Sequence, residues 1–107
     1  GGRALDHTPG TIEVLPEIAA AVKGRIRIFL DGGIRSGVDV LKALALGAEA
    51  VLVGRPIAIA AVGGGAAGVK IQLDQIAEDL RTAMMLTGCS NLEQISPAVV
   101  RVPRSWL

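Results

Sequence analysis

Two glycine-rich turns, each with an arginine close behind, contain the residues whose types and spacing best suit chemistry. The first is Asp31-Gly32-Gly33, with Arg35 two residues further on, and the second is Gly54-Arg55-Pro56. Glycine lets backbone N–H groups come close to an oxyanion because no Cβ stands in the way. The planar guanidinium group of arginine matches phosphate oxygens with paired hydrogen bonds. Together the two turns predict a phosphate-binding site.

Two predicted strands bring these turns to the same place. The apolar stretch 25–30 precedes the first turn, and the stretch 50–53 precedes the second. If the strands are parallel, both turns lie at the carboxyl edge of one sheet, where α/β proteins bind ligands. The second turn would also begin a short helix, whose N-terminal end favours anions. The alternative is that both are ordinary tight turns with surface arginines.

Other candidate residues have less support from their surroundings in the sequence. The Asp31 carboxylate could accept a hydrogen bond from a ligand or cap its own turn. Arg3 could bind a substrate carboxylate, but an arginine in a glycine loop is also typical of a solvated surface. His7 is the only histidine, yet no partner motif accompanies it, so we interpret it and Asp6 as surface loop residues. No metal site is predicted.

The composition is typical of α/β layers and excludes some functions. Half of the residues are apolar, 14 are glycine, and the formal net charge is +1, which argues against a nucleic-acid surface. The single Cys89 cannot form an internal disulfide. We expect no segment that crosses a bilayer. Only two clear strands are present, and two parallel strands cannot cover both faces of their sheet. We therefore expect part of a larger barrel or sheet and not a complete domain.

The remaining elements follow from apolar periodicity and capping residues. Thr11 should cap the first helix, although Pro16 suggests that this helix starts nearer Leu15. Ser36 and Asp39 form a capping-box pattern, and Gly88 suits a helix C-cap. Met84, Met85 and Cys89 should pack at a helix interface. The predicted helices are 11–23, 36–46, 57–61 and 69–87, with a glycine-rich break at 63–68, one turn at 91–95 and an extended tail at 96–107.

Several of these segments together resemble a known family. They are Gly1-Gly2-Arg3-Ala4-Leu5-Asp6, the run from Asp31 to Ala48, Val53-Gly54-Arg55-Pro56 and, near the end, Met84–Cys89. Over residues 1–95 the chain closely resembles the C-terminal part of the FMN-dependent α-hydroxy acid oxidases and dehydrogenases. The resemblance implies strands 7 and 8 and helices 6 to 8 of a (β/α)8 TIM barrel, in a single FMN-binding domain of which residues 1–107 are a segment.

The resemblance also implies roles for particular residues. Arg3 matches the arginine that holds the substrate carboxylate. The FMN phosphate and ribityl chain are held by the residues that match Asp31, Gly32, Gly33, Arg35, Gly54 and Arg55. The family's catalytic histidine base falls just before Gly1 and is not in this chain, and His7 does not match it. Ser36 stands where many members carry a second arginine.

The implied reaction is oxidation of an L-2-hydroxy acid, such as glycolate or lactate, to the 2-oxo acid. The partners it implies are the rest of the barrel, the hydroxy acid, and O2, a quinone or a cytochrome as acceptor, in a homotetramer. The ending Ser105-Trp106-Leu107 differs from the peroxisomal Ser-Lys-Leu signal, so we expect a cytoplasmic location. We expect these 107 residues alone to be inactive.

Two alternatives remain open at this point. One is another phosphate-binding barrel, such as type 2 isopentenyl diphosphate isomerase, IMP dehydrogenase or glutamate synthase. The Gly-Gly-Arg context of Arg3 argues against it, because a carboxylate-binding arginine there suits hydroxy acids. The other alternative is a non-catalytic barrel fragment that serves as a binding or assembly module.

Overall fold

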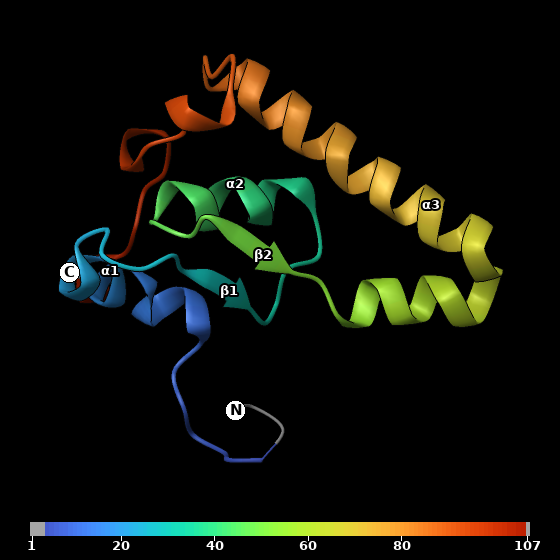
Figure 1. Cartoon of the computed structure of the whole chain (residues 1–107), viewed down its shortest axis with the longest axis horizontal. Helices are drawn as coiled ribbons and strands as arrows, with labels where there is room; N and C mark the ends of the chain where they lie inside the picture. The colour runs from blue at the N-terminus through green and yellow to red at the C-terminus, as the bar shows by residue number, and fades with distance from the viewer. Residues whose placement is uncertain (1–3, 107) are drawn as a thin grey trace.

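The computed structural model describes residues 4–106, which form a parallel βαβ unit with a helix before it and a long helix after it (Figure 1). The elements are α1 (Thr11–Val22), β1 (Phe29–Asp31), α2 (Gly37–Ala45), β2 (Ala50–Leu52), α3 (Arg55–Leu86) and three 3-10 turns, η1 (Leu92–Gln94), η2 (Pro97–Val99) and η3 (Arg104–Trp106).

The two strands pair in parallel, as predicted, with Asp31 opposite Leu52 at their carboxyl ends. Both are shorter than predicted, and β1 lacks most of the stretch 25–30. Strand geometry starts only where the partner strand lies alongside: the N–H of Glu49 donates to the carbonyl of Ile28 (2.8 Å) just before the paired residues. Arg25 lies outside β1 because its backbone N–H donates to the carbonyl of Val22 (2.9 Å) in the turn after α1, where its guanidinium also bonds.

Helix α1 begins earlier than Pro16 suggested. Thr11 is its first residue and Gly10 its N-cap, so Thr11 does not cap the helix as predicted. Pro16 lies inside the helix, where it removes one backbone hydrogen bond. The neighbouring Leu15 is almost fully buried in the main core, and this packing offsets the missing bond.

Helix α2 lies between the sheet and the second half of α3, and it begins as predicted (Figure 1). The Ser36 side chain caps it by accepting from the N–H of Asp39 (3.3 Å). Two buried clusters meet at α2. The larger joins it to α1, the sheet and α3, and consists of Leu15, Leu30, Ile34, Val40, Ala43, Ala48 and Ile76. The smaller joins it to the C-terminal segment and consists of Leu41, Ala45, Cys89 and Ile95.

The predicted glycine-rich break between two helices is only a kink at one residue. Helix geometry continues through Gly63 and Gly64 and fails at Gly65, whose φ of 59° and ψ of −147° are open to glycine alone. Figure 1 shows α3 turning a sharp corner into two limbs. The periodicity of this segment predicts one apolar stripe that includes Leu73, Ile76 and Leu80. The second limb presents Ile76 and Leu80 to the core, but Leu73 is 51% exposed.

Helix α3 also corrects the expectation that no segment could cross a bilayer. The helix is long enough and apolar enough to cross a membrane by length and composition alone, with a mean hydropathy of 1.3 over 18 residues. However, every 18-residue stretch of α3 with at most two charged residues contains Gly65. The limb before this kink, residues 55–64, is about 15 Å long at 1.5 Å per residue, half the thickness of the hydrocarbon core. The apolar stretch is therefore not one straight helix.

The C-terminal segment follows the capping prediction to within one residue but not the predicted extended tail. The C-cap of α3 is Thr87, one residue earlier than predicted, and Gly88 follows it with a φ of 77°. The N–H of Cys89 then donates to the carbonyl of Met84 (2.8 Å), which closes the helix end. Cys89 is buried, but Met85 is 65% exposed, so Met85 does not pack at an interface as predicted. Residues 96–106 contain two 3-10 turns, and the second lies against α1.

Candidate phosphate-binding site

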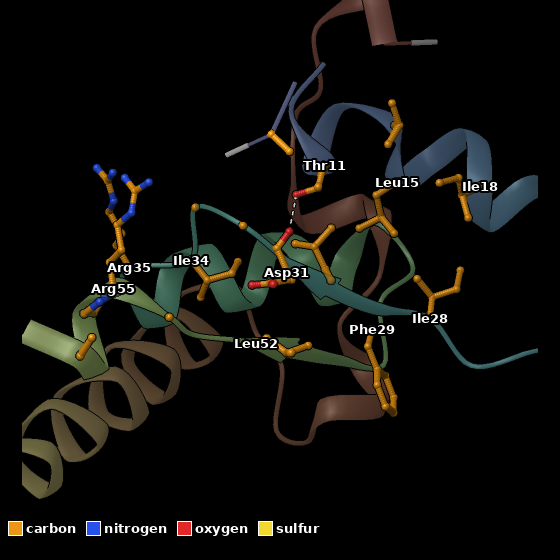
Figure 2. Close-up of a pocket in the computed structure, with 18 residues that line it drawn as sticks. Thr11, Leu15, Ile18, Ile28, Phe29, Asp31, Ile34, Arg35, Leu52 and Arg55 are labelled. Atoms are coloured by element: carbon orange, nitrogen blue, oxygen red, sulfur yellow. Dashed lines mark hydrogen bonds between the residues drawn. The ribbon is translucent and has the colours of Figure 1, made fainter. Parts of the chain in front are cut away.

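A cavity of about 1300 Å³ opens at the carboxyl ends of β1 and β2 (Figure 2). The structure brings six of the seven predicted site residues to its lining. These are Asp31, Gly32, Gly33, Arg35, Gly54 and Arg55. The seventh, Arg3, lies outside the described residues. The rest of the lining is mainly apolar and comes from α1, the strands and the start of α3.

The first turn is held at both of its ends. At the start, Thr11 Oγ1 donates to the backbone carbonyl of Asp31 (2.7 Å; Figure 2). At the end, the backbone N–H of Arg35 donates to Asp39 Oδ2 (3.0 Å). Gly32 is required between them, because its φ is +107° and a Cβ there would lie 3.1 Å from Thr11 Oγ1. The turn is therefore a fixed backbone loop that stands over the cavity.

The second turn begins α3 at the same cavity. The N–H groups of Ile57 and Ala58 donate to the carbonyl of Gly54 (3.1 and 3.0 Å), and Pro56 has no N–H. No acceptor for the N–H of Arg55 is found in the described part of the chain, so this donor at the positive end of the helix dipole can serve a ligand. This is the arrangement that anions favour at a helix N-terminus.

Two guanidinium groups complete the site. The side chains of Arg35 and Arg55 are exposed, line the same cavity and point in the same direction in Figure 2. Within residues 4–106 neither forms an ion pair, whereas Arg27 pairs with Glu49 (3.6 Å) and Arg81 with Glu78. Two like charges that line one cavity, neither of them in an ion pair within the described residues, are suited to binding an anion.

The other candidates lie apart from these groups or make no distinguishing contact. Asp31 lies on the exposed face of the sheet, and no hydrogen bond to its carboxylate is found in the described part of the chain. His7 and Asp6 are exposed in the loop before α1 and do not line the cavity, in agreement with the prediction that they are surface loop residues. Among residues 4–106, no cluster of three or more His, Cys, Asp and Glu side chains could hold a metal ion.

Sequence reasoning missed the contributions of Thr11 and Asp39 to the turn. Thr11 was expected to cap its own helix, but its hydroxyl contacts a residue 20 positions away. Asp39 was expected to complete a capping box with Ser36, but its carboxylate bonds one residue earlier, to Arg35. The sequence does indicate that Asp39 bonds to the backbone just before α2, because an acidic residue at this position is typical of a helix start. The partner of Thr11 depends on the tertiary fold, so the sequence does not indicate it.

Fold and site together define an α/β protein that presents an anion-binding edge of a parallel sheet. The chain belongs to the FMN-dependent dehydrogenase family, whose model matches residues 1–102. The predicted family is thereby confirmed, and FMN is the cofactor after which that family is named. The match extends past the predicted limit of residue 95 into the C-terminal segment.

Individual relatives are hydroxy-acid oxidases. The chain is 54% identical over 101 residues to human 2-hydroxyacid oxidase 1, a match that covers 94% of this chain and 27% of that protein. It is 50% identical over 101 residues to L-lactate oxidase from Lactobacillus jensenii, covering 94% of this chain and 25% of that protein. The chain thus spans less than a third of the length of these relatives.

Solved structures of mandelate oxidase match the fold closely. The structure with 3,3-difluoro-2-hydroxy-3-phenylpropionic acid superimposes with a TM-score of 0.86 at 51% identity, covering 90% of this chain and 29% of that one. A mandelate oxidase variant with a monooxide FMN adduct gives a TM-score of 0.83 at 53% identity, covering 86% of this chain and 29% of that one. The βαβ unit and its flanking helices therefore match part of a larger enzyme fold.

Proposed function

We propose that this chain binds the phosphate of FMN in an enzyme that oxidises an L-2-hydroxy acid to the 2-oxo acid. The phosphate grip is our name for the residues that would do so, namely the Asp31–Gly33 turn, Arg35, Gly54 and Arg55. The observation that carries the proposal is the convergence on one cavity of two glycine turns and two guanidinium groups that form no ion pair within residues 4–106. A flavin mononucleotide has a terminal phosphate that these groups suit. The relatives, which are named as hydroxy-acid and lactate oxidases, support the reaction class.

The residues present fit such a cofactor. Arg35 and Arg55 would neutralise the phosphate, and the N–H of Arg55 would donate to it at the start of α3. Glycines 32, 33 and 54 would let the phosphate and the chain that bears it approach the backbone. The chemistry that FMN supplies when bound is acceptance of two electrons from the substrate and their transfer to an acceptor. The protein groups in this chain would bind and orient the cofactor.

The uncovered face of the sheet supports a larger barrel as the setting. Phe29 is 63% exposed and Leu52 48% exposed on the face opposite α2. In a (β/α)8 barrel this face is the packed interior, where such side chains are covered by the other strands. We propose that the remaining strands cover it, that they contribute the catalytic base, and that Arg3 binds the substrate carboxylate. A tetramer of such barrels is part of the same proposal.

The alternatives have less support. The relatives named above are hydroxy-acid oxidases, which favours oxidation of a hydroxy acid over the reactions of type 2 isopentenyl diphosphate isomerase, IMP dehydrogenase and glutamate synthase. A non-catalytic module would share the phosphate grip, so the structure of the site does not separate it from an enzyme. Electron transfer from a hydroxy acid to the flavin distinguishes the enzyme from the non-catalytic module, so the experiment measures that transfer.

The test uses a chimera in which residues 1–102 replace the matching segment of human 2-hydroxyacid oxidase 1, with which the chain is 54% identical. We expect the purified chimera to retain FMN, and its flavin absorbance to bleach on addition of glycolate or L-lactate without oxygen. The 107-residue chain alone should not reduce flavin. A folded chimera that retains FMN but never bleaches would favour the non-catalytic module.

A second measurement separates phosphate binding from flavin binding in general. Riboflavin lacks the phosphate, so the chimera should bind FMN at least tenfold more tightly than riboflavin, about the effect of one charge-assisted hydrogen bond. Equal affinities for the two flavins would contradict the phosphate grip, whatever the activity of the chimera.

A further inference from the structure

We infer that Thr11 is a positioning residue for the phosphate grip, and that its hydroxyl fixes the Asp31–Gly33 turn in the orientation that binds the ligand. The inference rests on the proposed function and adds to it a residue that was predicted only to cap a helix and not to belong to the site. Thr11 begins α1 and reaches the turn from a separate element (Figure 2). Its contact is the 2.7 Å hydrogen bond to the carbonyl of Asp31.

The hydroxyl of Thr11 is committed to this contact. A threonine hydroxyl has one hydrogen, and here it is donated to Asp31. The side chain is free for this role because α1 has Gly10 as its N-cap, and the backbone carbonyl of Gly10 accepts from Glu13 (3.0 Å). Although Thr11 lines the cavity, its oxygen can only accept towards a ligand, and so it is unsuited to bind a phosphate oxygen directly.

Anchoring the Asp31 carbonyl determines where the following N–H points. The peptide unit is planar and trans, so the N–H of Gly32 lies opposite the carbonyl that Thr11 holds. Gly32 and Gly33 have φ values of +107° and +76°. Because glycine has no side chain, the peptide units beside it rotate more easily than those beside any other residue. An external anchor is therefore needed to keep one orientation, and Asp39 supplies the second anchor at Arg35.

The close approach of the turn to Thr11 supports the same role. A Cβ on Gly32 would lie 3.1 Å from Thr11 Oγ1 and 3.8 Å from Thr11 Cγ2. The Thr11 side chain therefore occupies the space beside Gly32, and its hydroxyl bonds to the turn. Valine keeps the packing and removes the bond, whereas serine keeps the bond and removes the methyl group. This pair of substitutions separates the two contributions.

The experiment measures dissociation constants for FMN and riboflavin in the chimera with Thr11→Val and Thr11→Ser. We expect Thr11→Val to weaken FMN binding about fivefold to tenfold, the usual effect of one lost hydrogen bond, and to leave riboflavin binding unchanged. Thr11→Ser should stay within about twofold of the parent for both flavins. Thr8→Val is the matched control, because Thr8 is exposed and does not line the cavity.

Two outcomes would overturn the inference: unchanged FMN binding in Thr11→Val, or equal weakening for both flavins, which is what a general loss of stability would give. If the parent chimera does not prefer FMN, the phosphate grip itself fails. Hydrogen exchange at the amides of Gly32 and Gly33 then decides about Thr11. Exchange several-fold faster in Thr11→Val than in the parent supports the anchor, and equal exchange refutes it.

Discussion

Gly37 and Leu80 lie so close together that a Cβ on Gly37 would come within 2.1 Å of the backbone nitrogen of Leu80. Gly37 is the first residue of α2, directly after the site turn, and Leu80 belongs to the second limb of α3. Backbone therefore packs on backbone where α2 begins. This contact connects the element that carries the turn to the long helix that covers it.

Gly37→Ala should destabilise the protein by about 1–3 kcal/mol, because the added methyl group forces the two helices apart. In an unhindered helix the same change stabilises by about 0.4–1 kcal/mol, so the sign of the effect identifies the contact. Gly63→Ala is the control, since Gly63 is helical, exposed and has open space around its Cα. Urea unfolding measures both; stabilisation by Gly37→Ala would refute the close packing.

In the chimera, Arg35→Met should weaken FMN binding about tenfold. This is near the lower end of the effect of losing a charge-assisted hydrogen bond, because Arg35 is exposed. Arg55→Met should act in the same direction, and riboflavin binding should change in neither. The effect should shrink as salt is raised, since exposed charges are screened. Arg27→Met, at a side chain that is 81% exposed and outside the cavity, is the control. Equal effects of Arg27→Met and Arg35→Met would show that only net charge matters.

Ser36 has a dual relation to the site, because its side chain caps α2 and it directly follows Arg35 in the site turn. Ser36→Ala and Ser36→Arg should each cost about 1 kcal/mol of stability through loss of the cap. Only Ser36→Arg adds a cation beside the turn, so it alone should tighten FMN binding by a few-fold. Thermal unfolding and flavin titration of the two variants measure the two effects separately. Equal FMN affinities would mean that position 36 does not reach the phosphate.

Gly65→Ala should destabilise the protein by about 1–3 kcal/mol, because the backbone at the kink has a conformation that residues with a Cβ rarely adopt. Gly64→Ala should be neutral or slightly stabilising, since Gly64 is helical and its surroundings are open. Urea unfolding of the two variants gives the comparison. If they behave alike, the corner in α3 is not a required feature.

Local features of the fold were predictable because the interactions that make them span few residues. Ser36 contacts Asp39, and Gly88 closes α3 through residues just before it, so short motifs were enough. Features set by distant partners were not. The length of β1 depends on how far β2 lies alongside it, and the presence of Pro16 inside α1 depends on the burial of Leu15.

The same distinction applies to the site. The glycines and arginines could be found from sequence because each turn follows its own strand, and parallel strands end at one edge. The hydrogen bond from Thr11 to Asp31 joins residues 20 positions apart, and no spacing rule indicates it. The kink at Gly65 was placed in the right segment, but three consecutive glycines gave no means to choose among them.

A sheet of two strands has no inner strand, and this has a consequence for handling the chain. Within the described residues, β1 and β2 pair only with each other, so each has one side with unpaired backbone N–H and C=O groups. Such sides can template the addition of strands from other molecules. Beside the exposed Phe29 and Leu52, they make uncontrolled aggregation the main hazard when these residues are produced by themselves.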